Sequence, residues 1–343
     1  DRIDSVAPNA TGAIQPDKYW VISPFGGGGY TLNLTLPHNV SDHTKAYLGR
    51  WNGSAWEYGR TSSTANSVTL DGVAQLSTWA IAAPEPALDL NGATSGVDYA
   101  TTFTEDGGAA GVAAADAFIT DPDSAIMSGA TVTIDATPDG ADESLDANAG
   151  GTSIIKSYSS ITRILRLSGV DTKANYEQVL RSVAYNNLSQ NPNTANRTLT
   201  FIVTDDTSVQ SSPVNTVVTV VAQNDAPVIS VNTGMTLSRG EVATITSAML
   251  SATDGDNTAA QITFTVTAGP NYGALQLNGS PTTTFTQDDI INTRVTYAHG
   301  GGYDPTDSFT FNVSDGAGGV ITGQMFNITL TPVSEVPDWK KIF

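Results

Sequence analysis

Alternation of apolar and polar residues with a period of two runs through this chain and constrains its fold more than any other feature. Leu199, Phe201 and Val203 fall on one face of an extended segment, and residues 309–313 repeat the pattern. Such runs, bounded by Gly, Asn, Asp and Pro, are typical of antiparallel strands with one buried face. Helical periodicity is scarce, and its best example covers residues 174–185. The sequence therefore predicts an all-β chain built from tandem antiparallel β-sandwich domains.

Two proline-containing junctions divide the chain, whose 343 residues exceed the size of one ordinary sandwich. Proline removes a backbone donor and favours extended geometry, so residues 84–86 and 224–227 are interpreted as short linkers. Because the chain starts at Asp1, we expect the first domain to lack its opening strands. The expected parts are a β-domain over residues 1–84, a β-sandwich over 87–225, a further β-sandwich over 227–333 and a tail over 334–343.

The balance of charge limits the partners of this protein. The chain has 34 Asp and Glu residues against 15 Lys and Arg residues, which gives a net charge of −19. Such a chain repels phosphate backbones, so we expect no nucleic-acid partner. Its carboxylates either stay solvated, which keeps an exported protein in solution, or gather around cations.

The chain contains no cysteine, which excludes disulfides, thiol catalysis and Cys-based zinc sites. Its composition is typical of exported β-proteins, in which bound cations can take the place of disulfides. No run approaches the roughly 18 apolar residues that a spanning helix needs, so we expect no transmembrane segment. No leader precedes Asp1, and we expect any secretion signal to have been removed or to lie outside this sequence. These features predict an extracellular, secreted or cell-surface location.

The second and third expected domains look like two versions of one plan. ITDPDS at residues 119–124 parallels ATDGDN at 252–257, and the strand-like segment at 196–206 parallels the one at 307–316. The order of the matching segments is the same in both. The second domain is longer mainly between residues 146 and 176, where we expect an inserted hairpin or loop. Serial β-domains of this kind act as spacers or stalks.

Ordered motifs along the third domain carry a resemblance to a known family. They are LSRGE at 237–241, DGD at 254–256, GPNYGAL at 269–275, FTQDDI at 285–290, VTYAH at 295–299 and DSFTFNVSDG at 307–316. With these motifs the domain resembles the chondroitin sulfate proteoglycan (CSPG) repeat, itself a cadherin-like sandwich. The second domain, with FTEDGG at 103–108, ITDPDS and QNDAPV at 223–228, is similar to the cadherin-like repeats of large bacterial surface adhesins. The resemblance implies cadherin-like or immunoglobulin-like sandwiches.

Calcium is the cofactor that this resemblance implies. A hard cation takes six to eight oxygen ligands from carboxylates and carbonyls. Cadherin-like domains supply them from a Glu near one end, a D-x-D turn, a strand-end Asp and an Asn-Asp linker. In the second domain the matching positions are Glu105, Asp121, Asp123, Asp205, Asp206, Asn224 and Asp225, and in the third they are Glu241, Asp254, Asp256 and Asp315.

The same acidic turns have an alternative explanation. Asp and Asn are also favoured in such turns because their side chains hydrogen-bond the local backbone. The third domain has no Asn-Asp linker after it, which weakens the case for an ion there. We therefore expect calcium first at the end of the second domain, near the junction that follows it.

Catalytic motifs are absent from the sequence. The chain has three histidines, and neither H-E-x-x-H nor G-x-S-x-G occurs. Acidic pairs on sandwich loops seldom provide the cleft that glycoside hydrolysis needs. The sequence therefore predicts that the protein is not an enzyme and has no catalytic residue.

Two roles stay open beside the structural one. Trp51, Trp56 and Trp79 suggest a carbohydrate-binding module, although W-N-G-S-A-W also fits a hairpin whose aromatic residues pair across strands. A non-catalytic accessory arm of an exported enzyme is the other. The interpretation that we favour is an extracellular structural or adhesive segment of a large multidomain cell-surface protein, a calcium-stiffened rod or a component of a filament or surface layer. Its expected partners are other surface proteins, glycans or copies of itself.

Overall fold

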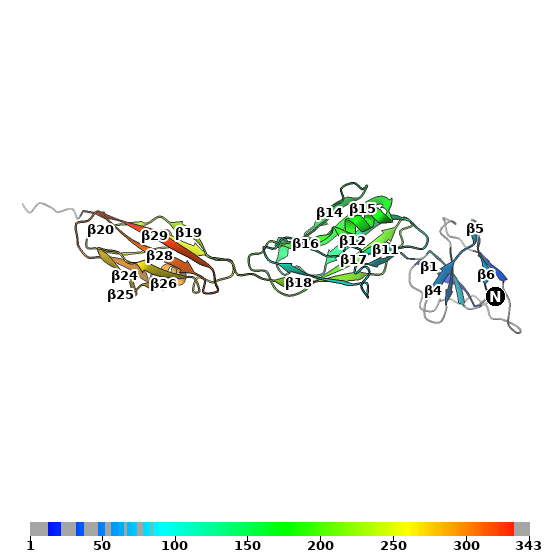
Figure 1. The fold of residues 1–343 in the computed structure, drawn as a ribbon, viewed down its shortest axis with the longest axis horizontal. Coiled ribbons are helices and arrows are strands. Elements are labelled where there is room, and N and C mark those ends of the chain that lie inside the picture. The colour runs from blue at the N-terminus through cyan, green and yellow to red at the C-terminus, as the bar shows by residue number, and fades with distance from the viewer. Residues whose placement is uncertain are drawn as a thin grey trace, which may run out of the picture. The chain divides into compact units, whose positions relative to one another are not determined.

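The protein forms two compact units, residues 1–221 and 222–343, each built from β-sheets (Figure 1). The computed structural model describes residues 13–21, 32–37, 47–51, 56–64, 67–73, 78–83 and 85–332. The all-β fold predicted from the alternation is confirmed. The junction expected at residues 84–86 falls inside the first unit, and the three domain boundaries stay predictions.

The first part of the first unit contains two small sheets. One pairs β1 (Ala13–Val21), β7 (Thr78–Ala83), β3 (Tyr47–Trp51) and β4 (Trp56–Gly59), and the other pairs β2 (Leu32–Pro37), β6 (Ser67–Val73) and β5 (Ser62–Thr64). Strands β3 and β4 form a hairpin in which Trp51 is the register partner of Trp56. The hairpin interpretation of W-N-G-S-A-W is therefore confirmed at the level of the backbone.

The second part of the first unit is organised around a six-stranded sheet. Its order is β14 (Ile155–Ser159), β15 (Ile164–Thr172), β12 (Ile126–Ile134), β17 (Arg197–Asp205), β18 (Val214–Val221) and β9 (Tyr99–Thr104). A three-stranded sheet consists of β10 (Ala110–Gly111), β16 (Ala184–Asn187) and β13 (Glu143–Asp146), and β11 (Phe118–Thr120) pairs with β8 (Ala87–Asp89). Leu199, Phe201 and Val203 are fully buried, as the alternation predicts.

The helical pattern at residues 174–185 corresponds to α1 (Lys173–Arg181), which buries Tyr176, Val179 and Leu180. A short 3-10 helix, η2 (Gly140–Asp142), precedes β13. The extra length between residues 146 and 176 is the β14–β15 hairpin, so the expected insertion is confirmed. No helix in the described part of the chain has the length and hydropathy of a membrane span.

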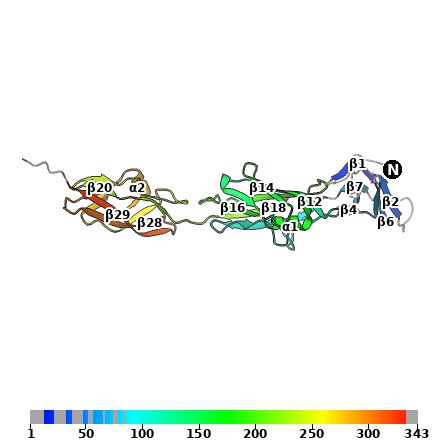
Figure 2. The same ribbon diagram turned by 90° about the horizontal axis from the view of Figure 1, so that it is seen from above.

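The second unit is a sandwich of a five-stranded and a four-stranded sheet, with helix α2 (Gln287–Ile291) at its side (Figure 2). Thr286 caps α2 through a capping box with Asp289. Phe309, Phe311 and Phe326 are buried in the core, where the ring of Phe309 stacks on that of Phe326 and lies tilted against that of Phe311. The strands are β20 (Met235–Ser238), β29 (Val320–Thr331), β28 (Thr306–Ser314), β23 (Thr263–Ala268) and β26 (Thr284–Thr286) in one sheet, β21 (Val242–Thr244), β27 (Val295–His299), β24 (Gly273–Leu277) and β25 (Ser280–Pro281) in the other, and the pair β19 (Val228–Asn232) and β22 (Leu250–Thr253).

Arg197 is a fully buried cation in the first unit. Its guanidinium lies 2.8 Å from Glu143 and 2.8 Å from Asp139, and the hydroxyl of Tyr185 donates to Glu143 at 2.8 Å. These partners satisfy the charges that burial takes out of water. Removing one partner of a buried pair leaves an uncompensated charge and costs about 3–5 kcal/mol.

We expect Arg197→Met to lower the melting temperature of the first unit by about 10 °C, because it strands the buried carboxylate of Glu143. Differential scanning calorimetry of the whole chain measures this. Arg166→Met is the control, because Arg166 is exposed on β15. A melting temperature for Arg197→Met equal to that of the control contradicts the role assigned to the buried pair.

Candidate metal centre

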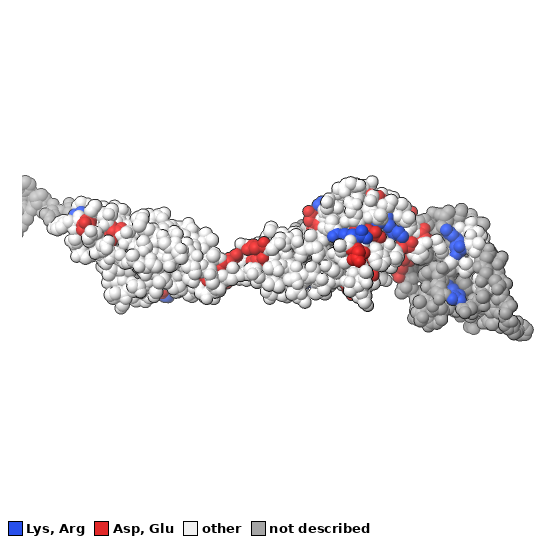
Figure 3. All heavy atoms as spheres, viewed as in Figure 1, with Lys and Arg blue, Asp and Glu red and all other residues white. Residues whose placement is uncertain are grey.

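Charged side chains of both signs share the surface of the first unit, so the net acidity of the chain does not by itself mark a site. On the face shown in Figure 3, Lys and Arg side chains of that unit lie beside Asp and Glu side chains. A candidate site therefore has to be found from the geometry of particular carboxylates.

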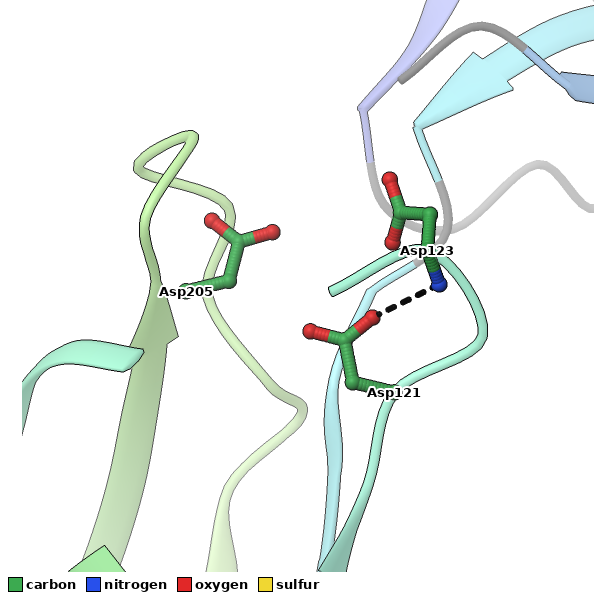
Figure 4. A group of neighbouring side chains, drawn as sticks. All are labelled: Asp121, Asp123 and Asp205. Carbon is green, nitrogen blue, oxygen red and sulfur yellow. Dashed lines mark hydrogen bonds between the residues drawn. The ribbon is translucent and has the colours of Figure 1, made fainter. Parts of the chain in front are cut away.

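Three of the predicted ligands meet at one end of the sandwich that is built around the six-stranded sheet. Asp121, Asp123 and Asp205 each offer one carboxylate oxygen, and these oxygens lie within 4.8 Å of one another (Figure 4). Asp121 and Asp123 belong to the loop between β11 and β12, and Asp205 ends β17. Within the residues that the structure describes, no other group of His, Asp or Glu brings three ligand atoms this close. We call this group the Asp triad.

Local hydrogen bonds fix the D-P-D turn. Oδ1 of Asp121 accepts from the backbone N–H groups of Asp123 and Ser124, both at 3.1 Å. This is an Asx-turn, the alternative explanation for acidic residues at such positions. It uses only one oxygen of Asp121, so the turn positions the carboxylate and leaves the second oxygen for another partner.

Asp205 is held by its own turn. Its Oδ1 accepts from the backbone N–H groups of Thr207 and Val209, each at 2.8 Å, and its side chain is fully buried. Asp206, the next residue, is exposed and accepts from the hydroxyl of Ser124 at 2.7 Å. Asp206 therefore ties the end of β17 to the D-P-D turn from outside the triad.

The Asp triad fits a hard divalent cation. Asp121 is 9% exposed, and its Oδ2 is buried with no hydrogen-bond partner. Carboxylates about 5 Å apart repel each other by roughly 3 kcal/mol per pair at an effective dielectric constant of 20. A cation among them removes both costs. All the donors are carboxylate oxygens, which calcium prefers.

Glu105 lies at the other end of the same sandwich. Its backbone N–H donates to the carbonyl of Val221 at the end of β18. Strands β17 and β18 are antiparallel, and Arg197 pairs with Val218. From this pair, Asp205 lies eight residues along the sheet in one direction, and Val221 lies three residues along it in the opposite direction. Strands rise about 3.4 Å per residue, so about 37 Å separates the two ends. Glu105 therefore does not belong to the Asp triad, contrary to the single site predicted for this domain. The triad also lies at the end of the sandwich opposite Val221, and not near the junction after this domain where calcium was expected first.

Asn224 and Asp225 contact the acidic turns of the second unit, a correction to their predicted assignment. The backbone N–H of Asp225 donates to Asp256 at 2.7 Å, and the side-chain amide of Asn224 donates to Asp315 at 2.7 Å. Oδ1 of Asp254 accepts from the backbone N–H of Asp256, as in the D-P-D turn. The linker pair thus belongs with the D-G-D turn that follows it in the sequence.

Asn257 also belongs to the polar cluster around the D-G-D turn, although it was not among the predicted ligands. Oδ1 of Asn257 and Oδ2 of Asp254 are both buried, and neither atom has a hydrogen-bond partner. The parallel between ATDGDN and ITDPDS contained the signal, because Asn257 takes the place of Ser124. Glu241 lies elsewhere: it is exposed beside the end of β29, whereas Asp315 precedes the start of that 12-residue strand, about 35 Å away.

Asp315 is held as a carboxylate by a ring of donors. The side-chain amide of Asn224 and the backbone N–H groups of Ala317, Gly318 and Gly319 hold the pKa of Asp315 below its usual value, against the opposing effect of desolvation. Only glycine fits at position 319, because a Cβ there would lie 2.3 Å from Oδ2 of Asp315. The depressed pKa stabilises the folded state above the unfolded pKa of about 3.9, and this stabilisation is lost as pH falls through the folded pKa.

We expect Asn224→Ala to raise the pKa of Asp315 toward about 3.9, because the variant removes the strongest donor to the charged form. A pH titration of the Asp315 carboxyl carbon by NMR measures this. Asn232→Ala is the matched control, since that amide donates to the carbonyl of Met325 instead. An unchanged titration in Asn224→Ala contradicts the role of the linker.

The predicted carbohydrate residues cannot be placed as a binding surface. Trp51, Trp56 and Trp79 stand in β3, β4 and β7, and their side chains lie outside the described residues. The tail at residues 334–343 also lies outside them.

The second unit contains a cadherin-like domain: residues 227–330 match the family model of that description, where the CSPG-type resemblance was drawn. Relatives of this chain include the human extracellular matrix organizing protein FRAS1, 37% identical over 113 residues that make up 32% of this chain. Human FRAS1-related extracellular matrix protein 1 is 36% identical over 104 residues, 29% of this chain, and human chondroitin sulfate proteoglycan 4 is 35% identical over 124 residues, 35% of this chain.

The matches span 3% to 5% of the length of these relatives. Among solved structures, human protocadherin-24 EC1-2 covers 72% of this chain and 99% of its own, with 11% identity and a TM-score of 0.29. A similarity this low adds nothing to the fold described above.

Proposed function

We propose that this chain is an extracellular structural or adhesive segment of a larger surface protein, in which calcium at the Asp triad stiffens the first unit. The observation that carries the proposal is the buried Oδ2 of Asp121, which has no hydrogen-bond partner and belongs to a carboxylate grouped with those of Asp123 and Asp205. The names of the relatives, which are extracellular matrix proteins and a proteoglycan, support the location and the non-enzymatic role.

The ion stiffens the chain by joining segments that are distant in sequence. A cation held by Asp121, Asp123 and Asp205 ties the loop before β12 to the end of β17. The carbonyl of Pro122, between the two turn aspartates, also accepts a hydrogen bond from the hydroxyl of Tyr47 on β3 at 3.2 Å. Calcium therefore fixes a turn that contacts the preceding β-domain, and the stiffened junction is the one near residues 84–86.

Partners are proposed from the same role. A serial array of β-sandwiches presents surfaces to other surface proteins, to glycans or to copies of itself. A carbohydrate-binding function through Trp51, Trp56 and Trp79 stays the alternative, because their side chains lie outside the described residues.

We expect saturating Ca²⁺ to raise the melting temperature of the first unit by about 5 °C or more relative to EDTA, because an ion at 100 times its Kd stabilises by about 2.7 kcal/mol. Asp121→Asn should abolish this increase, and in EDTA it should melt at or above the wild type because one repelling charge is gone. Calorimetry of the whole chain measures both.

The matched control for this experiment is Asp106→Asn, which removes the same charge from an exposed turn in the same unit. It should keep the full response to Ca²⁺. If chelation leaves the melting temperature of the wild type unchanged, the proposed calcium role fails.

A further inference from the structure

Lys173 brings a positive charge to the edge of the Asp triad. It is the first residue of α1, and its backbone N–H donates to the carbonyl of Ala125 at 2.9 Å. Its ammonium group donates to the backbone carbonyl of Asp121 at 3.4 Å. Thr172 caps the helix and pairs with Ile126 in the β12–β15 ladder. The start of α1 is thus fastened to the loop that contains two triad members, and the ammonium group has a defined place.

The first position of a helix, which Lys173 occupies in α1, is electrostatically unfavourable for a lysine. The first turn of a helix carries the positive end of its dipole, where acidic side chains are stabilising and cations are not. The first turn of α1 contains no acidic residue. The ammonium group of Lys173 instead contacts the backbone carbonyl of Asp121 in the D-P-D loop.

The second unit has a neutral residue at the corresponding place. Helix α2 is also capped by a threonine, Thr286, and its first residue is Gln287. The side-chain carbonyl of Gln287 accepts from the backbone N–H of Ala252 at 2.8 Å, two residues before Asp254. In both units the first helical residue therefore contacts the segment at the D-x-D turn, but only Lys173 brings a charge.

We propose that Lys173 is a built-in counter-charge that regulates how tightly the Asp triad binds a divalent cation. Without an ion, the ammonium group offsets part of the repulsion among the three carboxylates. With an ion, it repels the divalent charge and lowers the affinity. The inference rests on the proposed calcium site and assigns the residue that tunes it.

The size of the effect follows from the distances. Bond lengths place the carboxylate of Asp121 within about 8 Å of the ammonium group that touches its carbonyl. For an ion about 8 Å from the ammonium group, in a water-like dielectric, that single positive charge weakens the binding of the divalent ion by about five- to tenfold. The effect should shrink as salt screens it, because the Debye length falls to about 3 Å at 1 M.

The test compares Lys173→Gln, the residue found in α2, with the wild type in the whole chain. Isothermal titration with Ca²⁺ gives the affinity, and the Asp121→Asn chain identifies the heat that belongs to the triad. We expect Lys173→Gln to bind Ca²⁺ about five- to tenfold more tightly at low salt, with a smaller difference at 1 M NaCl. We also expect it to melt at a lower temperature than the wild type in EDTA.

Two further variants exclude a merely structural effect. Lys173→Arg keeps the charge and should keep the wild-type affinity, and Lys173→Met keeps the aliphatic stem and should behave as Lys173→Gln. Arg166→Gln removes the same charge from an exposed site on β15 and should change the affinity little.

The outcomes separate the two proposals. Equal Ca²⁺ affinity in Lys173→Gln and the wild type overturns the role of Lys173 while the calcium site stands. The same holds if Lys173→Gln lowers only the melting temperature, or if Arg166→Gln tightens binding as much. Absence of triad binding in the wild type and in every variant overturns the calcium site itself.

Discussion

The pairing of β12 with β17 is the interaction on which the candidate site depends. The ladder runs from Met127 opposite Asp205 to Ile134 opposite Leu199. It is held by burial of alternate side chains on both strands, which also makes its register specific, because a slip by one residue would expose every core residue. The D-P-D loop enters β12 at the point where β17 ends, so the same ladder that builds the core brings the triad together.

The fold and the local turns could be predicted because both follow from short-range patterns. Alternation determined which residues of β17 and β28 are buried, and the period is independent of how the strands are connected. The D-x-D turns depend on hydrogen bonds within three residues, which a sequence displays directly. Thr286 as a helix cap is local in the same way.

The composition of the site could not be predicted, because it depends on strand direction. Glu105 follows β9, which runs parallel to β18, and Asp121 precedes β12, which runs in the same direction as β18. A residue after one strand and a residue before another strand of equal direction lie at opposite ends of a sheet. The sequence shows that these acids are near strand ends without showing which end. Lys173 was missed for a related reason, since tertiary packing alone brings it to the D-P-D turn. Asn257 belongs to the D-G-D turn itself, and its signal lay in the parallel with ITDPDS.

Within the described residues, carboxylates are placed in three different environments. The comparison shows how the Asp triad differs from the other two. Asp139 and Glu143 surround the buried Arg197, and Asp288 and Asp289 lie 3.1 and 3.0 Å from Arg294. Asp315 is held by an amide and backbone N–H groups. In the triad, Asp121 keeps a buried oxygen without any such donor, and the ammonium group of Lys173 binds the carbonyl instead of the carboxylate. This arrangement leaves room for a diffusible cation, and the proposed role of Lys173 is to adjust how tightly that cation binds.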